Sequence, residues 1–301
     1  MVAVLNMVGG PESSRRNLSG GDARRQPADS GKTHLLRRFP SPRLRPRVNQ
    51  TDSKYVEKPG YLSQLAHESE LAFREMDGHL ATEFGSEEEW LRCIREDFPK
   101  FTGFLTGRCK LRFHGRILEI GAGAAWFSAE LSKLPDVQEV FATDFSPRLL
   151  KEQAPRIFTM LKADGRKITR MPADFHALDF PDGHFDFVVC SAVLHHAVDM
   201  VRLLREARRV LKPGGTFVAI REPVWPLVNF KSRSATQQKL IAAGVNEHLY
   251  TLAEYRKFFT EAGFKLETVR VNLATGLKFL FNEAVNGLTH ARYAFLAHNP
   301  K

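Results

Sequence analysis

The sequence has few cysteines and no long hydrophobic run. Its three cysteines, Cys93, Cys109 and Cys190, are too few and too widely spaced for a disulfide framework or a Cys-x-x-Cys metal knuckle. We therefore expect a reducing, cytoplasmic environment and no resident metal. No apolar stretch approaches the roughly 20 residues that cross a bilayer, so we expect no transmembrane segment. The opening MVAVLNMV lacks the basic flank and the cleavage site of a signal peptide.

Acidic residues are scarce at the N-terminus, and this explains most of the net charge of +10. Residues 1–50 hold ten Lys and Arg against three Asp and Glu, whereas the remaining residues hold 34 against 31. The segment is rich in Arg, Pro, Gly and Ser and has little periodicity, so we expect a solvated leader over residues 1–53. The alternatives are a basic arm that contacts phosphate groups or a membrane surface, and an organelle-targeting segment. The nearly neutral remainder makes a nucleic-acid partner unlikely.

The sequence has no internal repeats. The segment after the leader, residues 54–112, is predicted to form a helical lid. Apolar residues from Leu62 to Met76 recur at helical spacing. Ser86 and Glu89 form a capping-box pattern that opens a second helix.

Strand-like and helix-like segments alternate from about residue 113 to the end. They begin with RILEI, AWFSAELSKL and VQEVFAT, and the pattern continues through FDFVVCSAV and TFVAIRE. Strict alternation predicts a doubly wound α/β domain with a mostly parallel sheet. Such sheets bind ligands at the carboxyl ends of their strands, so functional residues are sought directly after each strand.

The first strand is followed by a turn with two glycines, Gly121 and Gly123. They let the backbone approach a ligand, and the following helix points amide dipoles at anionic groups. A dinucleotide fingerprint needs a third glycine where this sequence has Trp126, so a ligand with a carboxylate but no pyrophosphate fits better. Asp144 ends the next strand, where a carboxylate can accept hydrogen bonds from both hydroxyls of a ribose. Alternatively, Asp144 only caps the following helix.

Four segments resemble the motifs of class I S-adenosylmethionine-dependent methyltransferases, in the family's order. They are ILEIGAGAAWFSAEL, ATDFSPRLL, PADFHALDFPDGHFDFVVCSAVLHH and LLREARRVLKPGGTFVAI. Two departures are Ala125, where the family has a third glycine, and Leu178-Asp179-Phe180, where it often has Leu-Pro-Phe. The resemblance implies a Rossmann-like seven-stranded sheet with an antiparallel last strand, and S-adenosyl-L-methionine as cofactor.

The resemblance also assigns cofactor contacts. It implies that the methionine and ribose side is held by Glu119, Gly121, Ala122 and Gly123. It further implies a ribose contact at Asp144, adenine contacts at Phe145, Asp174 and Phe175, and a carbonyl beside the methionine at Cys190.

The resemblance implies direct displacement at the sulfonium methyl, for which the protein mainly positions the nucleophile and excludes water. His195 is our candidate general base, needed for an alcohol but not for a phenol; otherwise it lines the pocket or caps a helix. His196 and Glu222 lie at the same sheet edge, and Glu222 either contacts substrate or hydrogen-bonds the loop. A substrate insertion at about residues 223–251 adds polar and aromatic groups, namely Trp225, Asn246, His248 and Tyr250.

The leading interpretation is an enzyme that methylates a small-molecule acceptor such as a sugar, lipid or secondary metabolite, with oxygen favoured over nitrogen or carbon. The basic leader suggests a second interpretation, an RNA or protein methyltransferase. It ranks lower because the rest of the chain is nearly neutral and has neither an Asn-Pro-Pro-aromatic signature nor a catalytic cysteine pair. A non-catalytic binding module of the same fold is third. The sequence gives no indication of the oligomeric state.

Overall fold

A twisted sheet of eight strands lies at the centre of the computed structural model, in the order β1-β4-β3-β2-β5-β6-β10-β9. The structure describes residues 52–66, 68–225, 235–274, 276–286 and 293–301. The strands of this sheet are β1 (Lys54–Tyr55), β2 (Gly115–Ile120), β3 (Val137–Asp144), β4 (Ile168–Pro172), β5 (Phe185–Ser191), β6 (Leu211–Ile220), β9 (Lys265–Arg270) and β10 (Tyr293–His298). A separate pair is formed by β7 (Val224–Trp225) and β8 (Tyr250–Thr251).

The sheet confirms the predicted doubly wound fold. Strands β4, β3, β2, β5 and β6 run parallel, and the strand order reverses at β2, which pairs with β3 on one side and with β5 on the other. The last strand, β10, is antiparallel to both β6 and β9, between which it lies. One strand beyond the expected seven is present, because β1, within the segment predicted as lid, pairs with β4 at the sheet edge.

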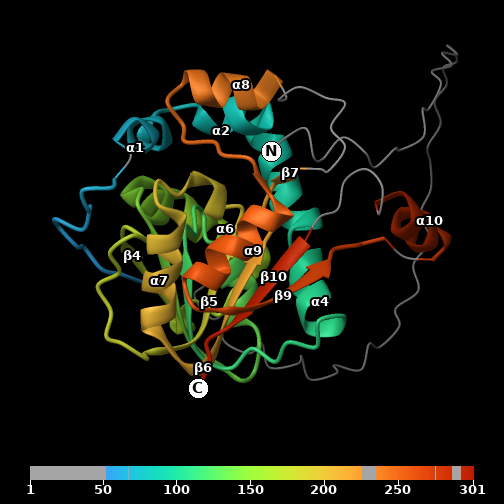
Figure 1. Ribbon diagram of the computed structural model, residues 1–301. Coiled ribbons are helices and arrows are strands. Elements are labelled where there is room, and N and C mark those ends of the chain that lie inside the picture. The colour runs from blue at the N-terminus through green and yellow to red at the C-terminus, as the bar shows by residue number, and fades with distance from the viewer. Residues whose placement is uncertain (1–51, 67, 226–234, 275, 287–292) are drawn as a thin grey trace, which may run out of the picture.

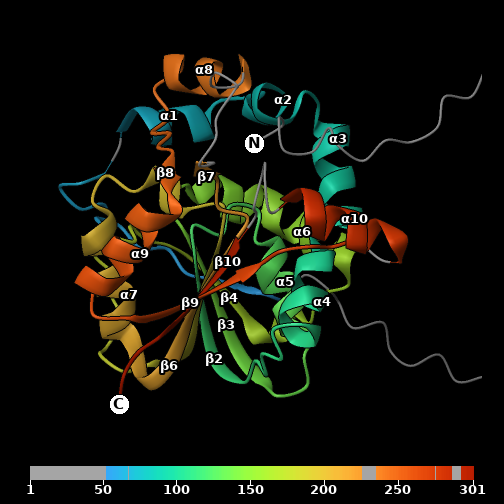
Figure 2. The same ribbon diagram turned by 45° about the vertical axis from the view of Figure 1, so that its right-hand side comes forward.

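Helices cover both faces of the sheet and its upper end (Figures 1 and 2). The helices are α1 (Glu68–Glu75), α2 (His79–Phe84), α3 (Glu87–Arg92), α4 (Pro99–Gly107), α5 (Trp126–Ser132), α6 (Ala154–Leu161), α7 (Met200–Val210), α8 (Ala235–Ala242), α9 (Leu252–Glu261) and α10 (Leu277–Asn286). In Figure 2, α4, α5 and α6 lie on one face of the sheet and α7 and α9 on the other. None of the described helices is long and apolar enough to cross a membrane.

The two faces are buried by two apolar clusters, one beneath α4, α5 and α6 and one beneath α7 and α9. Helix α7 illustrates how the sequence produces this arrangement. Its buried residues are Met200, Leu203, Leu204, Ala207 and Val210, which form one stripe at helical spacing. Asp199 caps the helix by accepting the N–H of Arg202. Strand β5 is apolar on both faces because helices cover both.

The lid lies over the carboxyl ends of the parallel strands, where Figure 1 shows α1, α2 and α8 at the top. Ser86 accepts the N–H of Glu89 over 3.1 Å, so the predicted helix start is confirmed. Helix α8 of the insertion packs on α2, and Phe73 of the lid joins Leu240 and Val245 in a small apolar cluster. The insertion therefore extends the lid. The predicted leader, apart from residues 52 and 53, lies outside the described residues.

Candidate functional site

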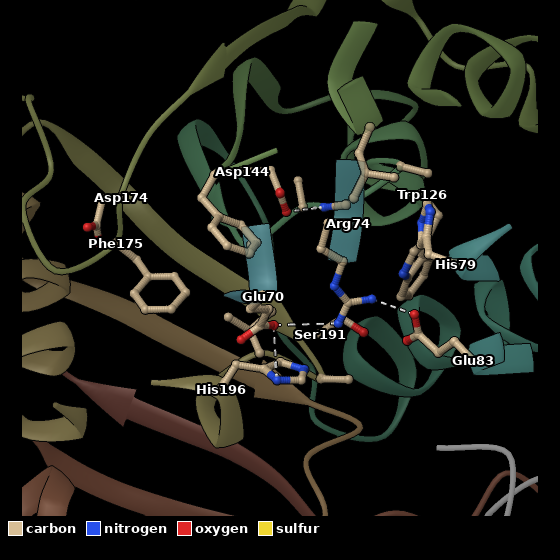
Figure 3. Close-up of a pocket in the computed structure, with 18 of the residues that line it drawn as sticks. Glu70, Arg74, His79, Glu83, Trp126, Asp144, Asp174, Phe175, Ser191 and His196 are labelled. Carbon is tan, nitrogen blue, oxygen red and sulfur yellow. Dashed lines mark hydrogen bonds and ion pairs between the residues drawn. The ribbon is translucent and has the colours of Figure 1, made fainter. Parts of the chain in front are cut away.

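A cavity of about 160 Å³ lies between the carboxyl ends of the strands and the lid (Figure 3). Seven of the nine residues predicted to contact the cofactor line it: Gly121, Ala122, Gly123, Asp144, Phe145, Asp174 and Phe175. These residues come from three different strand ends, which the parallel topology places at one edge. The structure therefore brings most of the predicted cofactor residues together.

The glycine turn and Asp144 form one unit. Gly121 and Gly123 both have left-handed backbones, with φ of 59° and 54°. Asp144 accepts the N–H of Gly123 over 2.7 Å through Oδ2 and the N–H of Ser146 over 2.9 Å through Oδ1. Burial raises the pKa of Asp144 to about 6, although these two hydrogen bonds act in the opposite direction. Each oxygen keeps a lone pair, so the carboxylate can still accept two ribose hydroxyls.

Asp174 also faces the cavity, but its oxygens already have partners. Oδ2 accepts the hydroxyl of Ser63 over 2.5 Å and the N–H of Ser63 over 3.0 Å. Oδ1 accepts the N–H of His176 over 2.8 Å and lies 3.0 Å from Nδ1 of the same ring. Burial alone would raise the pKa of Asp174, but the hydrogen bonds from His176 and Ser63 hold it below its usual range. The resemblance assigns an adenine amino group to this carboxylate, and we expect such a contact to require that Ser63 withdraws.

The other two predicted cofactor residues, Glu119 and Cys190, are buried and are not among the residues that line this cavity. Glu119 accepts the N–H of Ser128 over 2.8 Å and also the hydroxyl of Ser128, so it anchors α5 to β2. Burial raises the pKa of Glu119 to about 8. Burial likewise raises the pKa of the Cys190 thiol well above its usual value.

His195 and Glu222 form a buried pair behind the cavity. Nδ1 of His195 lies 3.0 Å from Oε2 of Glu222, whose Oε1 accepts the N–H groups of Val193 and Leu194. Glu222 therefore makes the loop hydrogen bonds that were one of its two expected roles. Burial lowers the pKa of His195 to about 3 and raises that of Glu222 to about 7. Only His196 of the two histidines lines the cavity.

The predicted residues of the insertion lie outside the cavity lining. Trp225 is the register partner of Thr251 in the β7–β8 pair, and the rings of His248 and Tyr250 stack 5.4 Å apart. Asn246 instead contacts the loop after β5, because its Nδ2 donates to the carbonyl of His196 over 2.9 Å. The structure therefore places Trp225, His248 and Tyr250 beside the site rather than in its wall.

The sequence interpretation missed a charged group on the lid. Arg74 of α1 pairs with Glu83 of α2 and lies 3.6 Å from Glu70, and Glu70 lies 3.3 Å from Nδ1 of His196 (Figure 3). All of these residues line the cavity and are buried or nearly so. One signal in the sequence could have indicated this group, namely the acidic and basic residues that interrupt the otherwise apolar helical segments of the lid.

Fold and cavity together define a doubly wound α/β domain with a ligand site at its strand ends and a lid above it. Residues 118–219 match the family described as a methyltransferase domain. The chain thus carries a class I S-adenosylmethionine-dependent methyltransferase domain, and S-adenosylmethionine is the cofactor of this class.

Three similar proteins illustrate the match. The 27-O-demethylrifamycin SV methyltransferase of Amycolatopsis mediterranei is 28% identical over 176 residues, which are 58% of this chain and 63% of that protein. A ubiquinone/menaquinone biosynthesis C-methyltransferase of Pseudomonas fluorescens is 34% identical over 125 residues, 41% and 46% of the two chains. The chain thus spans less than two thirds of these relatives.

The third is a solved structure, phosphoethanolamine N-methyltransferase 2 of Haemonchus contortus with phosphomonomethylethanolamine and S-adenosylhomocysteine. It has a TM-score of 0.57 at 16% identity and covers 76% of this chain and 60% of that one. At this identity the likeness concerns the fold.

The residues present fit the cofactor at the ribose end. A Cβ added to Gly123 meets no atom within 4 Å, so space is open over the turn, and Asp144 has free lone pairs beside it. The whole cavity, however, is smaller than the ~300–1,000 Å³ typical of ligand sites. We therefore expect the lid to move outward when cofactor and acceptor bind together.

Proposed function

We propose that this protein transfers a methyl group from S-adenosylmethionine to a small polar molecule, with oxygen as the favoured acceptor atom. One observation carries the proposal: a single cavity is lined both by the cofactor residues of the strand ends and by the charged residues of the lid. The strand ends are suited to adenosine, and the lid offers Glu70, Arg74 and Glu83 to a polar acceptor. The related proteins named above comprise both an O-demethylrifamycin and a quinone C-methyltransferase, which supports a small acceptor.

The mechanism that we propose is mainly positional. S-adenosylmethionine supplies a methyl group that is already activated on a sulfonium. The protein's own part is to orient the acceptor and to exclude water, which strengthens the interactions inside a closed site. Arg74 is held by two carboxylates and is suited to hold an anionic or hydroxyl group of the acceptor at a fixed place. An acidic acceptor such as a phenol then needs no strong base.

His195 remains our candidate base for a less acidic acceptor. Its Nδ1 is engaged by Glu222, so only Nε2 is able to take a proton. Because burial lowers its pKa to about 3, His195 is neutral at physiological pH but is a weak base. We therefore expect His195 to contribute only modestly to removing the proton of a less acidic acceptor.

The test is a transfer assay with the full chain and isotopically labelled S-adenosylmethionine on fractionated metabolite extracts. We expect one or more small molecules to gain the mass of one methyl group. Calorimetry with S-adenosylhomocysteine measures cofactor binding in parallel. Label appearing only in an RNA or protein fraction would replace the small-molecule proposal by the macromolecular one, and absence of cofactor binding would support a non-catalytic module.

A further inference from the structure

Two histidines and one glutamate converge just behind the wall of the cavity. One possible ligand atom from each of His195, His196 and Glu247 lies within 4.8 Å of the others. The two rings lie side by side, with centroids 4.0 Å apart and planes tilted by 40°. His196 also lines the cavity, so this cluster lies at its edge.

The three residues come from segments about fifty positions apart, and three hydrogen bonds fix them together. His195 and His196 lie in the short turn Leu194–His196 after β5, whereas Glu247 lies in the loop between α8 and β8. The N–H of His248 donates to the carbonyl of His195 over 3.0 Å. Nδ2 of Asn246 donates to the carbonyl of His196 over 2.9 Å, and Nδ1 of His196 lies 2.8 Å from the carbonyl of Asn246. Glu247 is therefore anchored on both sides by its neighbours in sequence.

The outer hydrogen bonds prepare both rings to bind a cation. Nδ1 of His195 faces the carboxylate of Glu222 over 3.0 Å, and Nδ1 of His196 faces the carbonyl of Asn246 over 2.8 Å. Each of these partners is an acceptor, so each ring carries its proton on Nδ1 and leaves a lone pair on Nε2. A carboxylate or carbonyl behind a histidine is the usual outer shell of a metal-binding imidazole.

The contact between Glu247 and His195 is not a hydrogen bond. The carboxylate Oε2 of Glu247 lies 3.9 Å from Nε2 of His195, beyond hydrogen-bond distance. The Glu247 side chain is only 7% exposed. A buried carboxylate is stabilised when a cation lies beside it.

We propose that His195, His196 and Glu247 form a binding site for a divalent transition metal, with Zn²⁺ as the best match. Two imidazoles and one carboxylate are donors that Zn²⁺ prefers, and three protein ligands leave a coordination position open. Ligand atoms on a tetrahedral zinc lie about 3.4 Å apart, given metal–ligand distances of about 2.0–2.2 Å. His195 and Glu247 are 3.9 Å apart, and all candidate ligand atoms lie within 4.8 Å of one another, so the side chains have to approach by up to about 1.4 Å to reach that value.

A metal here has two consequences. It would clamp the insertion loop to the end of β5, and it would lie near the cavity, because one of its ligands, His196, lines that cavity. Because Nε2 of His195 would be a ligand, a metal-bound His195 is not a general base. The metal site does not depend on the proposed methyl transfer, since binding is measured without acceptor or cofactor.

The test is titration of the tag-free full chain, treated with chelator and desalted, with Zn²⁺ in a calorimeter and with Co²⁺ in a spectrophotometer. We expect one equivalent to bind, a visible absorption band of tetrahedral cobalt, and an increase in Tm on addition of Zn²⁺. Glu247→Gln keeps the shape of the side chain and removes the anionic ligand, so it should weaken binding at least tenfold. His196→Ala should abolish the cobalt band.

Two exposed residues provide matched controls, because His114→Ala and Glu88→Gln make the same changes away from the cluster. Both should bind Zn²⁺ like the unchanged chain. Circular dichroism identifies any variant that fails to fold. If His196→Ala does not fold, Glu247→Gln alone tests the proposal. Zn²⁺ binding that is equal in Glu247→Gln and in the unchanged chain, or absent from both, overturns the proposal, whatever the outcome of the methyl-transfer assay.

Discussion

The hydroxyl of Ser63 donates to the carboxylate of Asp174 over 2.5 Å, so the lid occupies the oxygen that the family resemblance assigns to adenine. Ser63 precedes α1, and Asp174 follows β4. The backbone N–H of Ser63 binds the same oxygen. We therefore expect entry of the cofactor to be coupled to withdrawal of this segment.

Ser63→Ala should tighten binding of S-adenosylhomocysteine. The substitution removes one hydrogen bond to a charged group that competes with the ligand, worth about 1.5 kcal/mol, or roughly a tenfold change in affinity. Calorimetry measures the affinity. Unchanged or weaker binding would mean that Asp174 does not receive the adenine amino group. Ser69→Ala, a serine change at the start of α1, serves as control.

Asp144→Ala should weaken binding of S-adenosylhomocysteine by about 1.5–3 kcal/mol or more, since hydrogen bonds to a charged acceptor are lost. Burial raises the pKa of Asp144 to about 6, so the affinity of the unchanged chain should also fall as the pH drops below that value. Asp144→Asn should remove this pH dependence. Affinities of Asp144→Ala close to that of the unchanged chain would show that another carboxylate binds the ribose.

Gly121→Ala should destabilise the fold more than Gly123→Ala. Both positions have a positive φ, so both variants bear a backbone penalty of about 1–2 kcal/mol. Only at Gly121 would the new Cβ lie 2.6 Å from a methyl of Val193, which adds about 1–3 kcal/mol of overpacking. Urea unfolding measures the difference. The double change Gly121→Ala with Val193→Ala should relieve the clash, and its failure to do so would contradict this explanation.

Glu222→Ala should destabilise the protein by roughly 3 kcal/mol or more, because it leaves the N–H groups of Val193 and Leu194 and Nδ1 of His195 without their acceptor. Glu222→Gln keeps an acceptor oxygen and should lose less. The comparison uses the free energy of unfolding in urea, with the exposed Glu88→Gln as control. Equal losses from both Glu222 variants would show that an acceptor oxygen at this position does not by itself stabilise the loop.

The contribution of Glu119 to the unfolding free energy should fall as the pH rises from about 4.5 to about 8. Burial raises the pKa of Glu119 to about 8, so the folded state keeps a proton that the unfolded state has released. The contribution of Glu119 is therefore complete below the unfolded pKa and is lost as the pH rises through the folded pKa.

Glu119→Gln isolates this effect, because the amide does not titrate and still accepts the N–H of Ser128. Urea unfolding at about pH 5 and about pH 9 gives the slope for each protein. We expect the variant to lose less stability than the unchanged chain between these two values. Identical slopes would mean that Glu119 is ionised in the folded protein at low pH.

Much of the fold was predictable because it follows from local patterns and topology rules. The alternation of strands and helices defined the doubly wound sheet, and residues directly after β2, β3 and β4 were expected at one edge. Gly121, Gly123, Asp144 and Asp174 do line one cavity there. Their role in binding the cofactor remains a prediction, to which the variants above are directed.

Other features were decided only by tertiary structure. The strand β1 was not predicted, since two residues carry no periodicity, and they gain their pairing only from the exposed edge of β4. The approach of Glu70 and Arg74 to His196, and of Glu247 to His195, joins segments far apart in the chain. Sequence spacing specifies the neighbours of a residue along a helix or strand, whereas these contacts depend on how the lid and the insertion pack over the completed sheet.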